Sequence, residues 1–397
     1  MQKVVSSFCI NGIIYCFQFE SLGIGPVTVV RFLIFPLLLL YICSERRICI
    51  PKSFPLFFCL LFCIFEILSG IFNVEIPFIV QGMVNFLTIT VFVDYLIKKN
   101  GLSYTNLLLF ASYDLPCILC YLLTFNGVSL SNRFQGIYWD PNVMCLYIFI
   151  SFCAKIVLFK QEKRVLFKQF FCILFLLDII LIFSSLSRAG MLGLGVAVLL
   201  ATFMYSKWLF GLLLSMLSAL LGYMFYIALD LTWSLASTPL EALAYRFFVS
   251  SAVELEQGGS GSRSDRLERL FESLEKGEVS LLGNGTNFLP DGGYMHNGVA
   301  EFILAVGIPI GIFFIGVFVY LLWMNIVLPI LKGKGNFVLL FVLSFFIVAV
   351  FYSYLSFKSF YLFISFLLYL NIRRCRNVSV SRASTVKLLC KQSKNGY

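Results

Sequence analysis

The chain has 397 residues, of which 60% are hydrophobic and 13% are charged, and its formal net charge is +10 at pH 7. A soluble globular protein has an apolar share of about 45–50%, so this composition excludes an ordinary soluble protein. In a membrane chain an excess of Lys and Arg is mainly a signal of orientation, and we infer no nucleic-acid partner from it.

Apolar segments recur along most of the chain. A membrane-spanning helix needs roughly 20 apolar residues, because the hydrocarbon layer is about 30 Å thick. The pattern predicts an all-α polytopic membrane protein with about 12 transmembrane helices. The segments are residues 4–19, 27–43, 54–71, 76–97, 107–125, 143–159, 167–186, 191–205, 208–229, 299–327, 337–354 and 357–372. The predicted regions are a bundle of about nine helices (1–229), an external loop with short helices (230–297), C-terminal helices (298–372) and a basic tail (373–397).

Basic residues are distributed unequally between the connections. With the N-terminus in the cytoplasm, the two ends and the alternate connections hold 21 Lys and Arg residues, and the other connections hold 8. This count includes Lys155 in a cytoplasmic connection. Because Lys and Arg favour the cytoplasmic side, the distribution predicts that both termini are cytoplasmic and that residues 230–297 are external.

The only histidine, His296, lies where the external loop meets the apolar residues 298–327. An imidazole titrates near pH ~6.5, so it can act as a base at neutral pH. The alternative interpretation is a solvated or helix-capping histidine, because one imidazole is not a catalytic constellation.

The external loop also contains a predicted short helix. Its apolar stripe has helical spacing and comprises Leu267, Leu270, Phe271 and Leu274. If the stripe packs on the membrane domain, Arg266 points along the protein boundary, whereas Arg269 points to water within reach of Glu272. Arg266 is therefore the candidate for chemistry, and Arg263 remains possible. Beyond this helix, residues 281–285 (Leu-Leu-Gly-Asn-Gly) form a tight turn whose backbone N–H groups could hold an anion.

Asp140 and Pro141 precede a long apolar run. A carboxylate caps the free N–H groups of a helix, and Pro fits its first turn, so the pair predicts a helix start. Tyr138 and Trp139, just before it, suit either the membrane interface or the face of a sugar.

Arg188 interrupts an apolar stretch at the predicted external face. An arginine at membrane depth is costly, so it faces a cavity or a partner, or its side chain extends to the lipid headgroups. Glu66, Asp114 and Asp178 also fall within predicted spans, and any of them could pair with Arg188 or Arg31.

The order of these motifs resembles the O-antigen polymerase and ligase superfamily of bacterial polytopic membrane glycosyltransferases. The resemblance covers roughly residues 138–325. It rests on Asp140-Pro-Asn142, Ser187-Arg188-Ala-Gly190, Arg266-Leu-Glu-Arg-Leu270, Leu282-Gly-Asn-Gly285, and His296-Asn297 ahead of Glu301, Gly307 and Gly311. Two departures are Leu270, where the family usually has Trp, and the absence of Pro before Leu281. Both concern packing and leave the chemistry in place.

The resemblance implies a glycosyltransferase fold of the multispanning C type in the bacterial cytoplasmic (inner) membrane. The implied reaction takes place on the outer face and uses an undecaprenyl (polyprenyl) diphosphate-linked oligosaccharide as donor. Implied catalytic residues are His296, Arg266 and Arg188, and implied substrate-binding residues are Arg263, Asn297, Asp140 and Asn142. No cofactor is expected, and since the loop has no acidic cluster with metal-ligand spacing, we expect no metal.

Within this resemblance we expect polymerisation of lipid-linked repeat units in lipopolysaccharide or related surface-polysaccharide biosynthesis. The alternatives are a ligase that transfers finished glycan to lipid A–core, and a flippase for the same lipid-linked sugar. Expected partners are the lipid-linked oligosaccharide, membrane lipid, a chain-length regulator and a flippase, and no nucleic acid.

Overall fold

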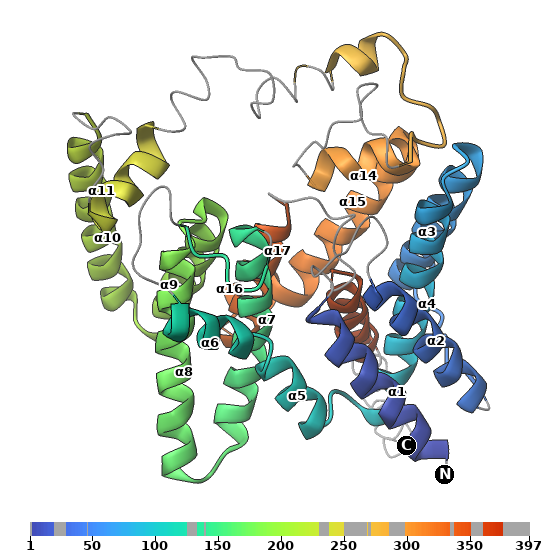
Figure 1. The fold of residues 1–397 in the computed structure, drawn as a ribbon, viewed down its shortest axis with the longest axis horizontal. Helices are drawn as coiled ribbons and strands as arrows, with labels where there is room; N and C mark the ends of the chain where they lie inside the picture. Colours follow the sequence, from blue (N-terminus) through green and yellow to red (C-terminus); the bar gives the residue numbers. More distant parts are fainter. Residues whose placement is uncertain are drawn as a thin grey trace, which may run out of the picture.

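A computed structural model gives the fold, and its described part is all-helical (Figure 1). The described residues are 2–19, 29–45, 47–124, 133–138, 140–229, 238–249, 268, 271–285, 298–333, 337–350 and 360–375. The first helices are α1 (Gln2–Phe17), α2 (Val29–Ser44), α3 (Phe54–Phe72), α4 (Ile76–Lys99), α5 (Tyr104–Ala111), α6 (Leu115–Thr124), α7 (Pro141–Gln161) and α8 (Val165–Ser184). They are followed by α9 (Arg188–Tyr205), α10 (Lys207–Leu229), α11 (Pro239–Ala244), the π-helix η2 (Tyr245–Val249), α14 (Gly298–Val306) and α15 (Ile308–Leu322). The last are the π-helix η3 (Trp323–Val327), α16 (Leu328–Leu331), α17 (Phe337–Val350) and a helix over residues 360–375.

The chain is a polytopic membrane protein. Within the described ranges, seven helical segments are long and apolar enough to cross a membrane, and α1, α2 and α9 are shorter apolar helices. Large apolar side chains are widely exposed on them; Trp208 on α10 is 73% exposed and Leu166 on α8 is 75% exposed. Such a surface is unfavourable in water but matches the hydrocarbon of a bilayer.

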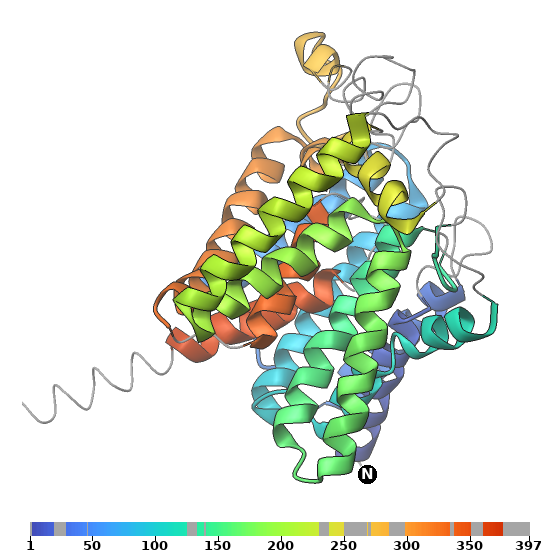
Figure 2. The same ribbon diagram turned by 90° about the vertical axis from the view of Figure 1, so that its left-hand side faces the viewer.

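Helix α7 lies at the centre of the bundle. It packs against α5, α8, α9 and α17, and most of its side chains are buried. Figure 2 shows α9 and α10 side by side and inclined to α7 and α8. The connection between α7 and α8 lies at the lower end of the molecule in Figure 1, whereas α11, residues 271–275 and α14 lie toward the upper end. The α7–α8 connection and α11, which the sequence predicts on opposite sides of the membrane, thus lie at opposite ends of the bundle.

The predicted span 107–125 is interrupted in the structure. α5 ends at Ala111 and α6 begins at Leu115, so the backbone leaves the helix at Ser112–Asp114. Ser151 Oγ on α7 lies 2.8 Å from the Ala111 carbonyl oxygen and 2.6 Å from Asp114 Oδ1. A break at membrane depth is tolerated because protein groups, in place of water, satisfy the freed backbone.

Asp114 belongs to a buried ionic cluster. Lys155 Nζ on α7 contacts Asp114 and lies 2.7 Å from Asp178 Oδ2 on α8, and all three side chains are 0% exposed. The assignment of Lys155 to a cytoplasmic connection is therefore wrong, and without it the basic residues are divided 20 to 8. The described partner of Asp114 and Asp178 is thus Lys155, whereas the sequence offered Arg31 and Arg188. Glu66, the third intramembrane acid, accepts hydrogen bonds from Asn85 and Tyr361, each at 2.9 Å.

The predicted span 299–327 is also wrong as a single helix. α14 ends at Val306, α15 begins at Ile308, and Gly307 between them has a φ of 89°. The turn at residues 281–285 crosses this break: Asn284 N–H donates to the Leu304 carbonyl at 2.7 Å. A Cβ at position 307 would be 2.0 Å from the Leu281 carbonyl oxygen, so only glycine fits both the backbone angle and the crossing.

We expect Gly307→Ala to destabilise the protein by about 3 kcal/mol, because alanine adds both a strained φ and a clash with backbone. Gly316→Ala on α15 is the matched control, since nothing lies within 4 Å of its added Cβ. It should be neutral or stabilising by up to about 1 kcal/mol through helix propensity. Thermal unfolding of both purified variants in detergent micelles measures the difference. Equal midpoints would show that the crossing of the two segments is not tight.

Candidate functional site

The beginnings of α7 and α9 lie together and form the core of the candidate site. Asp140 is the N-cap of α7, and its side chain accepts from the Asn142 N–H at 2.6 Å, which confirms the predicted helix start. Ser187 is the N-cap of α9 and accepts from the Gly190 N–H at 3.0 Å. The two helices are joined directly, because Ser187 Oγ donates to Asn142 Oδ1 at 2.6 Å.

Gly190 permits this close approach. A Cβ at position 190 would be 2.5 Å from Cys145 Sγ on α7. Ser185, in the turn before α9, contacts the same region: its carbonyl oxygen accepts a hydrogen bond from Arg133 Nε at 3.2 Å. Leu186 has a φ of +48°, which is strained for a branched side chain, and it is fully buried. The turn from α8 into α9 is therefore held in one conformation by its surroundings.

Two arginines give this corner its charge. Arg188 is the first residue of α9 and is half-buried. Arg133, half-buried as well, interacts electrostatically with Asp140 and Arg188. Burial is the main factor and lowers the pKa of the Arg133 guanidinium, Asp140 opposes this shift, and Arg188 adds to it. A guanidinium still stays protonated at physiological pH, so the corner combines two cations and the positive ends of two helices with one carboxylate, that of Asp140.

The structure brings together three of the seven predicted site residues: Asp140, Asn142 and Arg188. The other four, Arg263, Arg266, His296 and Asn297, lie outside the described residues, so their predicted roles stay predictions. Arg133 is the residue that sequence reasoning misses. Its signal was an arginine in the external segment that ends at the Asp140 cap.

Tyr138 is not available as a surface for sugar. It is 2% exposed and stacks on Tyr147 of α7, with ring centroids 4.7 Å apart and an interplanar angle of 1°. Its role is to pack the chain ahead of α7 onto the core. Trp139 lies outside the described residues.

The described part of the loop helix packs differently from the predicted stripe. Leu274 contacts the core and Ser273 is 4% exposed, but Phe271 is 61% exposed. The prediction therefore holds for Leu274 and is wrong for Phe271. Glu272 forms an exposed ion pair with Lys276 at 3.3 Å.

The turn at residues 281–285 is a packing element. Two of its N–H groups are already used, because Gly283 donates to the Ser280 carbonyl at 3.0 Å and Asn284 donates to the Leu304 carbonyl. Asn73 at the end of α3 donates to the Gly283 carbonyl at 3.2 Å. The anion site predicted at this turn is therefore wrong for these two N–H groups.

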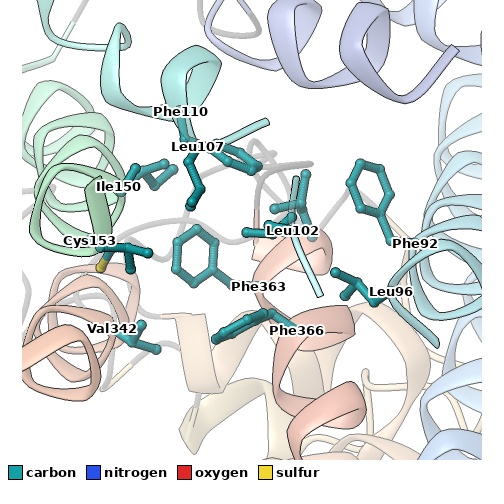
Figure 3. Close-up of a pocket in the computed structure, with 13 residues that line it drawn as sticks. Phe92, Leu96, Leu102, Leu107, Phe110, Ile150, Cys153, Val342, Phe363 and Phe366 are labelled. Atoms are coloured by element: carbon teal, nitrogen blue, oxygen red, sulfur yellow. The ribbon is translucent and has the colours of Figure 1, made fainter. Parts of the chain in front are cut away.

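A cavity of about 80 Å³ lies elsewhere in the bundle, on the side of α7 that faces α4, α5 and the helix over residues 360–375 (Figure 3). Its lining is apolar throughout and includes Phe92, Ile150, Cys153 and Phe363. Without charged groups it cannot stabilise a reaction that builds up charge. The corner of Arg133 and Arg188 is therefore the better candidate.

Comparison with known proteins found no family model, no curated protein and no solved structure that matches this chain. Within the described ranges no three His, Cys, Asp or Glu side chains converge as metal ligands do. A mechanism without metal stays a prediction.

Proposed function

We propose that this protein polymerises polyprenyl-diphosphate-linked oligosaccharide repeat units on the outer face of the bacterial cytoplasmic membrane. In this proposal the bundle is a glycosyltransferase fold of the C type with about 12 spans and cytoplasmic termini. The growing glycan is transferred from its lipid diphosphate to a hydroxyl of the incoming unit. The observation that carries the proposal is the corner where Arg133, Arg188 and the beginnings of α7 and α9 meet.

The charge of this corner suits the reaction. As the acceptor oxygen bonds to the anomeric carbon, the bond to the lipid diphosphate breaks and negative charge builds up on the leaving oxygen. A guanidinium group binds phosphate through two parallel hydrogen bonds, and the positive ends of the helix dipoles favour the same negative charge. Donors fixed before the reaction stabilise the transition state without a cost of reorganisation. Arg188 and Arg266 would bind the diphosphate, and His296 would take the proton from the acceptor hydroxyl.

Deletion of the gene, followed by a gel of surface polysaccharide, tests the proposal. Loss of a polymerase leaves core that carries a single repeat unit. Loss of a ligase leaves bare core with finished glycan still on its lipid carrier. Loss of a flippase leaves repeat units on the inner face. Either of the last two results would overturn polymerisation.

A flippase is the second candidate, and one observation favours it. Asp114, Lys155 and Asp178 form a charged cluster beside a break in a membrane helix. Broken helices with charged groups at membrane depth are typical of transporters that couple transport to an ion. The corner of Arg133 and Arg188 favours diphosphate chemistry instead. It lies at the ends of α7 and α8, where a lipid diphosphate at the membrane surface would meet the two guanidinium groups.

We expect chelators to leave activity intact. Purified protein with lipid-linked substrate should form polymer at an unchanged rate in EDTA, because arginines supply the charge that a cation would otherwise provide. Glycan products resolved on a gel give the readout. Activity that vanished in EDTA and returned with Mg²⁺ would reject the arginine account in favour of metal-assisted departure of the diphosphate.

The proposed topology has its own test. A reporter that is active only outside the cytoplasm should be active when fused near Gly259, and inactive when fused at Lys163 between α7 and α8. The reason is the distribution of Lys and Arg, which favours the cytoplasm for the second site. The reverse pattern would invert the membrane orientation and remove the outer-face reaction with it.

A further inference from the structure

The cluster of Asp114, Lys155 and Asp178 has more negative than positive charge. With both carboxyl groups ionised it carries two negative charges and one positive charge, in a part of the bundle where all three side chains are 0% exposed. An uncompensated charge in such surroundings costs several kcal/mol. The described structure therefore has one negative charge to neutralise.

The uncompensated negative charge can be assigned to one oxygen atom. Asp178 Oδ2 lies 2.7 Å from Lys155 Nζ, but Asp178 Oδ1 is buried and accepts no hydrogen bond from a donor among the described residues; Asp178 also interacts with the second carboxylate, Asp114. Asp114 is better satisfied, because Lys155 contacts its Oδ2 and Ser151 lies 2.6 Å from its Oδ1. A buried carboxylate oxygen with no donor is rare, and it indicates a proton or another bound group.

Asp94 shows what a compensated carboxylate looks like in the same protein. It is also 0% exposed, but its Oδ1 accepts from the Cys49 N–H at 2.7 Å. Its Oδ2 accepts from Tyr41 at 2.8 Å and pairs with Lys98 at 2.8 Å. Every oxygen of Asp94 has a donor. Lys98 also pairs with Glu45 at 2.7 Å, but the side chains of Lys98 and Glu45 are 28% and 16% exposed, so solvent compensates this second carboxylate. Asp94 is the natural control for Asp178.

Among the described residues, no other group near the cluster supplies the missing positive charge. The other described titratable side chains on α5–α9 are phenols and thiols, neutral at physiological pH, and cations near the helix ends. The phenols and thiols are Tyr104, Tyr113, Cys117, Cys120, Tyr121, Cys145, Tyr147, Cys153 and Cys172, and the cations are Lys160, Lys168 and Arg188. Cys117 and Tyr138 interact electrostatically with Asp114 but carry no positive charge. α17, which packs on α7, has no titratable side chain.

We propose that the cluster is a proton-binding site, in which Asp178 Oδ1 binds one exchangeable proton from the solvent. A hydronium ion gives up the proton, its O–H bond breaks and a water molecule is left. The carboxylate becomes a carboxylic acid, and the cluster becomes neutral. The inference does not depend on the proposed glycosyl transfer.

The proton-binding site lies beside the break in a membrane-spanning segment, so binding of the proton affects that segment. Asp114 lies in the break between α5 and α6, and Lys155 connects it to Asp178 on α8. Loss of the proton leaves one excess negative charge among these helices, so Lys155 and the break must rearrange or admit water. Proton binding is thereby linked to the conformation of a membrane-spanning segment.

Infrared difference spectroscopy of the full chain in lipid nanodiscs tests the proposal without substrate. Between alkaline and neutral buffer, the wild type should gain the carbonyl-stretch band of a protonated carboxylic acid. Asp178→Asn should lose that band, because an amide there leaves one carboxylate and one ammonium. Asp94→Asn should retain it. Lys155→Met leaves two carboxyl groups without a cation, so its band should be about twice that of the wild type.

Size-exclusion chromatography first shows that each variant is folded, and Lys155→Met provides a second test if Asp178→Asn fails to fold. Identical bands in the wild type and Asp178→Asn would overturn the proposal. So would a band in Lys155→Met no larger than that of the wild type. A thermal stabilisation by Na⁺ that Asp178→Asn abolishes would overturn it as well, because the bound group would then be a metal cation.

Discussion

Arg188→Ala is expected to abolish polymer formation while the protein is still made and inserted. Arg188 begins α9 beside the junction of Asn142 and Ser187, where a leaving diphosphate would meet its guanidinium. Removing one prearranged donor from such a site lowers the rate by about 10²–10³-fold. The measurement is the length distribution of surface polysaccharide at matched protein level, followed by rates with purified protein.

Two further variants make this result specific. Arg188→Lys should restore little activity, because an ammonium lacks the planar pair of donors that fits phosphate. Arg164→Ala is the matched control at the opposite end of the bundle, where the exposed guanidinium stacks on Phe167 at 5.4 Å and contributes about 0.5–1 kcal/mol. Full polymer from Arg188→Ala would remove this corner from the reaction.

The loop offers a pair of arginines for the same experiment. The helical spacing predicts that Arg266→Ala is as damaging as Arg188→Ala. Arg269→Ala should cost little, because an exposed ion pair contributes about 0–1 kcal/mol. An essential Arg269 beside a dispensable Arg266 would show that the predicted helical phase is wrong.

Local chemistry explains which parts of the fold could be predicted. Asp140 and Pro141 mark the start of α7 because a carboxylate cap and a missing N–H act within one turn of the chain. Apolar runs such as those of α3 and α8 reveal helices because every residue contributes to hydropathy. These signals need no knowledge of neighbouring helices.

The breaks in the helices and the buried ion pairs depend on contacts with neighbouring helices. The sequence alone therefore did not predict them. The interruption at Ser112–Asp114 exists because Ser151, some 40 residues later, meets the freed carbonyl. Lys155 lies close enough to a run of basic residues to resemble a cytoplasmic charge, yet its partners are on α5–α6 and α8. Neither the helix break nor the burial of Lys155 changes the average hydropathy of its segment, so hydropathy cannot reveal them.

In the candidate site, too, features set by the local sequence could be predicted and features set by contacts between distant segments could not. Asp140, Asn142 and Arg188 were proposed as site residues through the resemblance. Asp140 also had a local signal, the cap ahead of Pro141, and Arg188 had another, a charge within an apolar stretch. The structure places all three at the starts of α7 and α9, and their roles stay predictions. Arg133 was missed, because its contact with the Ser185 carbonyl joins segments 52 residues apart. Ser187 was part of a motif, but its bond to Asn142 required both helices in place.

His296→Ala is expected to lower the rate by about 10²–10⁴-fold with donor binding little changed, if His296 is the general base. A free imidazole titrates near pH ~6.5, and once protonated it cannot accept the proton of the acceptor hydroxyl. The wild-type rate should therefore fall at acidic pH. Because His296 is the only histidine in the chain, that acidic limb should vanish in the alanine variant.

The same variant separates the base from a residue that only binds phosphate. A phosphate ligand would be replaced in part by another cation, so His296→Lys or His296→Arg would keep some activity, and His296→Ala would bind donor more weakly. For a base, these cationic variants should be as inactive as alanine, because neither side chain accepts a proton at neutral pH. Polymer of full length from His296→Ala at normal expression would make His296 a solvated or capping residue. The base would then have to be sought elsewhere at the corner of Asp140 and Arg188.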